Sequence, residues 1–98
     1  MSYLAFCTFD LKNASTQDYQ NAYSDLESIG LKKVTVTTQG NKVVIPTTAV
    51  MGEFNGKEAA SVCTDIRNRV QGAFKSRSFK SEIFVVVGAS WAWAPGTT

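Results

Sequence analysis

The stretch VTVTTQGNKVVIPTTAVMGEF, residues 34–54, indicates extended chain that turns back on itself. Its first residues alternate valine with threonine, which is the pattern of a half-buried strand. The residues QGN, 39–41, indicate a turn, and Pro46 cannot donate to a sheet ladder, so it belongs at an edge or just before a strand. A further strand is predicted over roughly residues 47–53. Two strands in succession therefore occupy the middle of the chain.

A helix is predicted on each side of this segment. Ser15 followed by Asp18 resembles a helix-capping pair, and Gly30 suits a helix C-cap because glycine accepts the left-handed conformation. One helical stripe between them holds Tyr19, Ala22, Tyr23, Leu26 and Ile29. The second helix begins near Lys57 and Glu58 and buries one face. Its apolar residues at three- and four-residue steps are Ala59, Val62, Cys63, Ile66, Val70, Ala73 and Phe74.

The outer segments complete the pattern. Residues 3–9, YLAFCTF, are predicted to form a buried central strand that Asp10 ends, and residues 83–87, IFVVV, a second central strand. The order strand–helix–strand–strand–helix–strand matches the ferredoxin-like βαββαβ plan of the α+β class. We therefore expect residues 1–98 to form one domain. It would have an antiparallel four-stranded sheet, its first and third strands central, and both helices on one face.

Composition excludes several classes of function. The chain is 44% hydrophobic and 18% charged, which is typical of a globular domain. It has no histidine and two cysteines, Cys7 and Cys63, so zinc sites of Cys and His and histidine-based triads are excluded. Phosphate-binding glycine motifs are absent. No stretch is long enough to span a bilayer, and residues 1–12 lack a basic leader, so we predict a cytoplasmic protein without a membrane partner.

Positive charge is concentrated late in the chain. The net charge is only +2, but residues 66–80 contain no acid. The basic residues there are Arg67, Arg69, Lys75, Arg77 and Lys80. They could form a face that binds the phosphates of RNA or DNA, since arginine and lysine neutralise phosphate charge. Cations near the end of a helix also complement its dipole and improve solubility, and the sequence leaves both interpretations open.

Three features together resemble the VapD-like group, which includes the CRISPR-associated protein 2 subunits and the antitoxin ribonuclease GhoS. They are the first strand with its aspartate (TFDL), the segment TTAVMGEFNG before a helix, and a closing apolar strand followed by GASWAW. The resemblance covers about residues 3–93. It implies a homodimer packed sheet to sheet that binds or cleaves nucleic acid. The biological setting implied is a toxin–antitoxin, CRISPR or phage-related system.

In nuclease members of that group, the aspartate at this place helps to hold a divalent metal. The resemblance therefore assigns Asp10 as a catalytic residue and Mg²⁺ ligand of a metal-dependent endoribonuclease. Asp10 has no second acid in its strand, so a metal would need a partner acid or the symmetry mate of Asp10, because hard cations require several oxygen ligands. The alternative for Asp10 is a turn former at the end of a strand. A non-catalytic protein-interaction or inhibitor module and a plain structural dimer are the rival functions.

Two tryptophans, Trp91 and Trp93, follow the last predicted strand. Residues separated by one position project to the same side of a strand, so both indoles are expected on one face. We predict that they are interface residues, packed on the uncovered face of the sheet in the same chain or in a partner subunit. The alternatives are a platform for base stacking and a contact for another protein.

Overall fold

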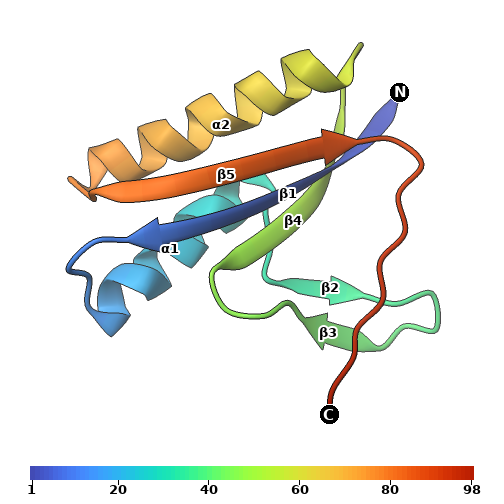
Figure 1. The fold of residues 1–98 in the computed structure, drawn as a ribbon, viewed down its shortest axis with the longest axis horizontal. Coiled ribbons are helices and arrows are strands. Elements are labelled where there is room, and N and C mark those ends of the chain that lie inside the picture. Colours follow the sequence, from blue (N-terminus) through green and yellow to red (C-terminus); the bar gives the residue numbers. More distant parts are fainter.

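The computed structural model describes residues 1–98 and has the α+β class predicted, with two helices and antiparallel strands. In chain order the elements are β1 (Ser2–Leu11), α1 (Thr16–Ile29), β2 (Val34–Val36), β3 (Lys42–Val44), β4 (Ala49–Asn55), α2 (Ala59–Ser76) and β5 (Ser81–Gly88) (Figure 1). Both predicted helices are confirmed.

The main sheet has three strands in the order β4–β1–β5, and both neighbouring pairs are antiparallel. β1 is central, as predicted. The prediction that residues 83–87 form a central strand is wrong, because β5 lies at the edge of the sheet. Its apolar run reflects two apolar faces: Val85 is half-buried toward the helices, whereas Phe84 and Val86 are exposed on the other face. β4 was also expected to be central and forms the opposite edge.

The strand predicted from Val34 does not join the main sheet. Only Lys32, just before it, pairs with β4. The backbone N–H groups of Lys32 and Met51 each donate to the carbonyl of the other, both at 2.9 Å, and this single bridge is the contact with β4. From Val34 the chain pairs instead with β3, which the sequence did not predict. Figure 1 shows the β2–β3 hairpin standing apart from the main sheet. The sheet therefore has three strands, with a separate two-stranded hairpin beside it.

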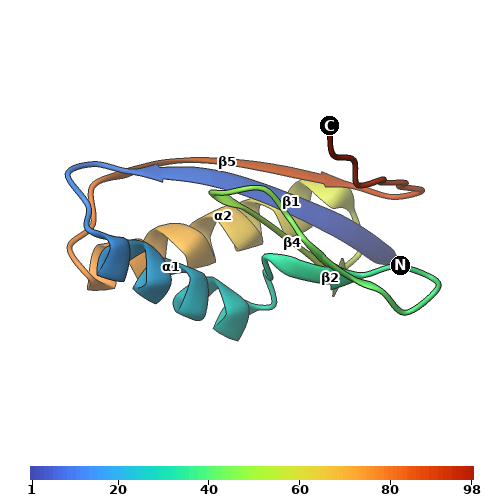
Figure 2. The same ribbon diagram turned by 90° about the horizontal axis from the view of Figure 1, so that it is seen from below.

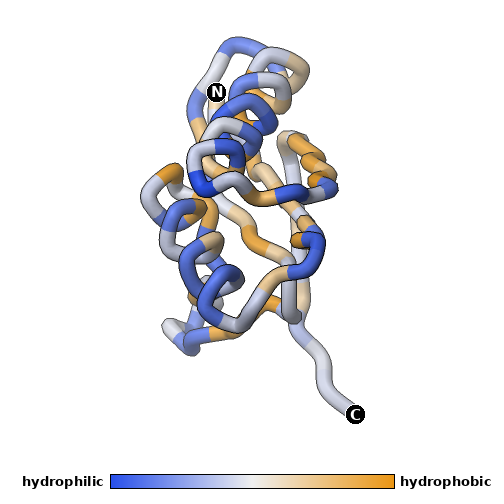
Figure 3. The backbone as a smooth tube through the Cα atoms, turned by 90° about the vertical axis from the view of Figure 1, so that its left-hand side faces the viewer, coloured by the Kyte–Doolittle hydropathy of each residue, from blue (hydrophilic) through white to orange (hydrophobic).

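Both helices lie against one face of the sheet, and the core fills the space between these layers (Figure 2). Alternate residues of β1 point into it, since successive side chains of a strand face opposite ways. These residues are at most 5% exposed: Tyr3, Ala5, Cys7, Phe9 and Leu11. The helices contribute Ala22 and Leu26 from α1 and Val62, Ile66, Val70 and Phe74 from α2. Along both helices, hydrophobic residues interrupt a mostly hydrophilic chain, as expected when one stripe is buried (Figure 3).

The ends of α1 are determined by local interactions. Ser15 and Asp18 form the capping box: the Asp18 backbone N–H donates to Ser15 Oγ at 3.1 Å, and the Ser15 N–H donates to Asp18 Oδ2 at 3.0 Å. Gly30 ends the helix with φ 105°, in the left-handed region, as predicted.

The prediction that Asp10 ends the first strand is wrong. β1 continues to Leu11, whose side chain is buried in the core. Asp10 lies on the other face of the strand, where its side chain is 64% exposed, and a polar residue there does not interrupt the ladder. Neither helix of the structure has the length and apolar character that crossing a membrane requires.

Candidate nucleic-acid interface

The uncovered face of the main sheet is apolar at its centre and charged at one end. In the β1–β5 register, Phe6 lies opposite Val86 and Asp10 lies opposite Glu82. Phe84 is 64% exposed and Val86 is 49% exposed. Exposed apolar residues that are grouped on one face differ from single scattered ones, because a group marks a contact surface. This face, on the side away from both helices, is the most apolar exposed part of the sheet.

Asp10 lies in a charged group that includes an acid which the sequence analysis missed. Lys12 Nζ lies 3.1 Å from Glu82 Oε1 and 3.8 Å from Asp10 Oδ2, so one ammonium contacts both carboxylates. The hydrogen bond with Glu82, reinforced by the charges of Glu82 and Asp10, raises the pKa of Lys12. All three side chains are about half exposed or more. No local signal joins Glu82 to Asp10, because their proximity depends on the register of β1 with β5.

The charged group at Asp10 does not fit a magnesium site within one chain. No cluster of three Cys, Asp or Glu side chains suited to a metal occurs in the structure. The two carboxylates present, Asp10 and Glu82, are both in contact with the Lys12 ammonium. Mg²⁺ prefers octahedral oxygen coordination, so a site here would need oxygens from a second copy of the chain or from a substrate.

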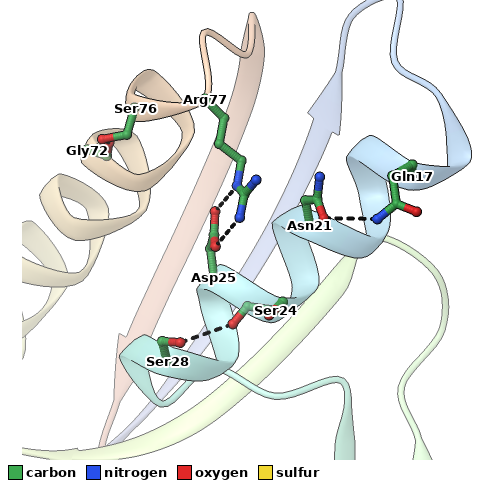
Figure 4. Close-up of polar contacts among 8 residues, drawn as sticks. All are labelled: Gln17, Asn21, Ser24, Asp25, Ser28, Gly72, Ser76 and Arg77. Carbon is green, nitrogen blue, oxygen red and sulfur yellow. Dashed lines mark hydrogen bonds and ion pairs between the residues drawn. The ribbon is translucent and has the colours of Figure 1, made fainter.

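The predicted basic residues are separated by α2 into two groups. Arg69 and Arg77 lie on the side of α2 that faces α1, where they line one groove. Arg69 is paired with Asp65 at 3.1 Å, and the Arg77 guanidinium binds both carboxylate oxygens of Asp25 in α1, one of them from Nη2 at 2.9 Å (Figure 4). The hydrogen bond from Arg77 is the main reason that the pKa of Asp25 is lowered. Both arginines are therefore engaged in ion pairs.

The remaining polar groups of this helix–helix groove are also paired. The hydroxyl of Ser28 donates to the Ser24 carbonyl at 3.2 Å, and that of Ser76 donates to the Gly72 carbonyl at 3.0 Å (Figure 4). One and two turns before Asp25 on the same stripe of α1, Gln17 donates to Asn21 at 3.0 Å. The groove between α1 and α2 therefore offers few free donors to a phosphate.

Arg67 and Lys75 lie on the opposite side of α2, along the seam between α2 and β5. Two cavities follow this seam. The first is lined by Cys63, Thr64, Arg67, Ile83, Phe84 and Val85, and the second by Gln71, Phe74, Lys75, Ser78, Phe79 and Ser81. Neither contains an acidic residue. Arg67 and Lys75 form no ion pair, and Lys80 is exposed between Phe79 and Ser81 at the end of the seam. Two of the five predicted basic residues, Arg67 and Lys75, therefore lie on this seam, whereas Lys80 lines neither cavity.

The outer edge of β5 runs along the same seam. The Lys12 N–H donates to the Lys80 carbonyl at 2.8 Å. Hydrogen-bonded pairs recur every two residues along an antiparallel ladder, so the even-numbered residues of β5 form the backbone hydrogen bonds with β1. The odd-numbered residues of β5 consequently turn their N–H and C=O groups away from β1, where β5 has no neighbouring strand. One of these groups has a partner: the Val85 carbonyl lies 3.6 Å from the Cys63 thiol.

Trp91 and Trp93 do not lie on a strand, so that expectation is wrong. β5 ends at Gly88, and Ser90 has φ 55°, which turns the chain out of the strand. The following residues cross from the β5 side toward the β2–β3 hairpin (Figure 1). There the two indoles line a cavity together with Leu4 and Met51 of the uncovered sheet face. The tryptophans therefore lie at the β4 side of that face, in the same chain.

The two cysteines lie in different surroundings. Cys7 is fully buried in the core, and this burial raises the pKa of its thiol to about 11. Cys63 is half-buried and points to the Val85 carbonyl. The thiolate is the reactive form of cysteine, so a raised pKa makes Cys7 inert.

No protein-family model matches this chain, and no curated protein matches its sequence. The resemblance to the VapD-like group therefore stays a prediction.

Proposed function

We propose that this chain is a small homodimeric protein that binds RNA or DNA, built on a ferredoxin-like plan whose fourth strand is reduced to the Lys32–Met51 bridge. The observation that supports binding is the seam between α2 and β5, where Arg67 and Lys75 have no acidic neighbour among the residues lining the cavities. Arg67 and Lys75 are eight residues apart in one helix, which separates them by about 12 Å along its axis. They can contact different phosphates of one strand, because phosphates recur about every 3.4 Å along a duplex axis.

The proposed dimer interface is the β5 side of the uncovered sheet face, around Phe84 and Val86, away from the tryptophans at its β4 side. It lies on the side of the sheet away from α2, so a second copy on this face leaves the cations of the seam accessible. The exposed area of Phe84 and Val86 would be removed from water on dimerisation. Burial of apolar surface contributes roughly 25 cal/mol per Å², and this is the main gain available to such a face. The occupant proposed is a second copy of the chain, packed sheet to sheet.

Binding does not require catalysis in this proposal. Endoribonuclease activity through Asp10 and Mg²⁺ depends on ligands that one chain does not bring together. Its test is separate: labelled RNA is incubated with magnesium or with chelator, using the native protein and Asp10→Ala. Magnesium-dependent cleavage that Asp10→Ala abolishes would establish the nuclease function.

A second candidate function, a protein-interaction or inhibitor module without nuclease activity, is favoured by one observation. The outward N–H and C=O groups of Ile83 and Val87 at the edge of β5 lack a partner strand. An extended segment of another protein can add to such an edge through backbone hydrogen bonds. Binding that is insensitive to salt and restricted to a protein would support this candidate.

The experiment that tests nucleic-acid binding compares Arg67→Ala with Arg69→Ala. Both variants remove one positive charge from the exposed surface of α2, but Arg69 is paired with Asp65 and faces α1. Affinity for labelled RNA and DNA is measured by fluorescence anisotropy over a range of salt concentrations. Loss of one phosphate contact lowers the slope of log affinity against log salt by about one. We expect this change for Arg67→Ala and not for Arg69→Ala.

Equal effects of the two variants would contradict the proposed location, since they would reflect net charge alone. Absence of salt-dependent binding to either nucleic acid by the native protein would contradict the proposed function.

A further inference from the structure

A cavity of about 340 Å³ lies between β4, the start of β2 and the segment after β5. It is separate from the α2–β5 seam and lies on the other side of the main sheet's central strand. Its lining includes Leu4, Lys32, Met51, Glu53, Trp91 and Trp93. The volume is within the range of small-ligand sites, which runs from about 300 to 1,000 Å³.

The apolar part of this cavity presents aromatic rings. Trp91 is half-buried and Trp93 is 36% exposed, and Leu4 and Met51 complete the apolar surface from the sheet. Indole rings are broad and flat, so they stack best on another flat ring. Every nucleobase offers such a face, whereas an aliphatic ligand does not.

The polar part of the cavity suits the edge of a base and its phosphate. Lys32 and Glu53 are the charged residues in the lining, both are exposed, and neither takes part in an ion pair. The backbone of Lys32 is already paired with Met51, which leaves its ammonium as the group available to a phosphate.

Glu53 adds backbone groups to this polar surface. Even-numbered residues of β4 form the backbone hydrogen bonds with β1. At the two ends of this ladder, the Phe9 N–H donates to the Thr48 carbonyl and the Gly56 N–H donates to the Met1 carbonyl. Odd-numbered residues of β4 therefore turn their N–H and C=O groups outward. Met51 uses its own with Lys32, and those of Glu53 have no partner strand.

We propose that this cavity binds one unpaired base of a single-stranded nucleic acid, stacked on Trp91 or Trp93, with the adjoining phosphate at Lys32. The proposal rests on the proposed nucleic-acid-binding function and names its preferred substrate class. A base inside a duplex is covered on both faces by its neighbours, so only a single strand or a loop can offer one to the indoles. The Glu53 carboxylate accepts hydrogen bonds, which favours cytosine, with its exocyclic amino group, over thymine.

Intrinsic fluorescence tests this proposal directly, because Trp91 and Trp93 are the two tryptophans of the chain and both line the cavity. The native protein is titrated with a short single-stranded oligocytidine DNA, with a duplex of matched length, and with an abasic oligonucleotide that has the same phosphates. Tryptophan emission is recorded, and binding is followed in parallel by anisotropy of the labelled nucleic acid. We expect emission to be quenched by the oligocytidine and not by the duplex or the abasic strand.

Single substitutions test whether oligocytidine binds in this cavity. Trp93→Ala is expected to weaken oligocytidine binding by roughly tenfold, which is about the contribution of one base stacked on an aromatic ring. Affinity for the abasic oligonucleotide should stay unchanged, because it has no base to stack. Trp93→Phe retains a ring and should retain most of the affinity. Glu53→Gln is expected to remove the preference for oligocytidine over oligothymidine. Val36→Ala, in the hairpin but outside the lining, is the control and should bind like the native protein.

Three results would overturn the proposal. If anisotropy reports binding of oligocytidine while tryptophan emission stays constant, the cavity is not the site, although the proposed function stands. If no nucleic acid binds, both fail together. If emission changes with protein concentration alone and not with oligonucleotide, a second copy of the chain covers the indoles.

Discussion

The carbonyl oxygen of Gly30 lies against the backbone of Gly52, in the space that the Cβ of any other residue at position 52 would occupy. Gly30 ends α1 in the left-handed conformation, and this turn directs its carbonyl toward β4. This close approach requires that position 52 has no side chain, and the chain that follows Gly30 brings Lys32 to its bridge with Met51.

We predict that Gly52→Ala destabilises the protein by about 2–3 kcal/mol, because the added methyl group meets backbone rather than a movable side chain. Urea denaturation measures the free energy of unfolding. Gly72→Ala is the matched control: nothing lies within 4 Å of its added Cβ, and alanine in a helix is favoured over glycine by roughly 0.5–1 kcal/mol. A Gly52→Ala protein as stable as the native one would show that the two segments separate easily.

The Asp25–Arg77 ion pair predicts a dependence of stability on pH. Arg77 lowers the pKa of Asp25 in the folded protein, so the pair stabilises the fold at pH values above the unfolded pKa of about 3.9. This contribution is lost as pH falls through the lower, folded pKa. Asp25→Asn should therefore lower Tm at pH 7 and have a progressively smaller effect in acid.

Thermal unfolding followed by circular dichroism at several pH values checks this. Asp65→Asn is the control, because its partner Arg69 lies four residues away in the same helix and both side chains are 56% exposed. Such pairs contribute little, about 0.3–0.5 kcal/mol. If the effect of Asp25→Asn were independent of pH, the pair would not account for it.

The two thiols should differ in reactivity. With a pKa of about 11 and no exposed surface, Cys7 is expected to react with iodoacetamide only after unfolding, whereas half-buried Cys63 should react slowly in the native protein. Peptide mass spectrometry after timed alkylation distinguishes them. Equal native labelling of both residues would mean that the sheet opens readily around β1.

The proposed dimer predicts a specific effect of Phe84→Ser combined with Val86→Ser. These side chains are 64% and 49% exposed in the single chain, so their replacement should leave folding nearly unchanged and convert a dimer to a monomer. Light scattering after size-exclusion chromatography gives the mass. Val44→Ser is the control, since Val44 is 68% exposed but lies on the hairpin. A native protein that is monomeric at all concentrations would contradict the proposed interface.

Local signals in the sequence predicted the helices well, because capping and periodicity depend on neighbouring residues. Ser15, Asp18 and Gly30 mark α1 through interactions within a few positions. Strand partners depend instead on residues far away in the chain, so the edge position of β5 and the departure of β2 from the sheet were not predictable in this way.

The candidate site also contains one contact that depends on strand pairing and one separation that local helix geometry explains. Glu82 joins Asp10 only through the register of β1 with β5, across 72 positions of sequence. The separation of Arg67 from Arg69 was within reach of the sequence, because two residues of a helix turn through about 200°. That rotation places one arginine on the seam with β5 and the other on the groove with α1.

The unpaired edge of β5 also determines how long its amide protons persist in heavy water. N–H groups of the even-numbered residues from Glu82 to Val86 are held by β1, whereas those of Ile83, Val85 and Val87 have no acceptor in the chain. Exchange protection should therefore alternate residue by residue along one strand, with slow amides beside fast ones. Any partner that adds to this edge would slow the fast set alone.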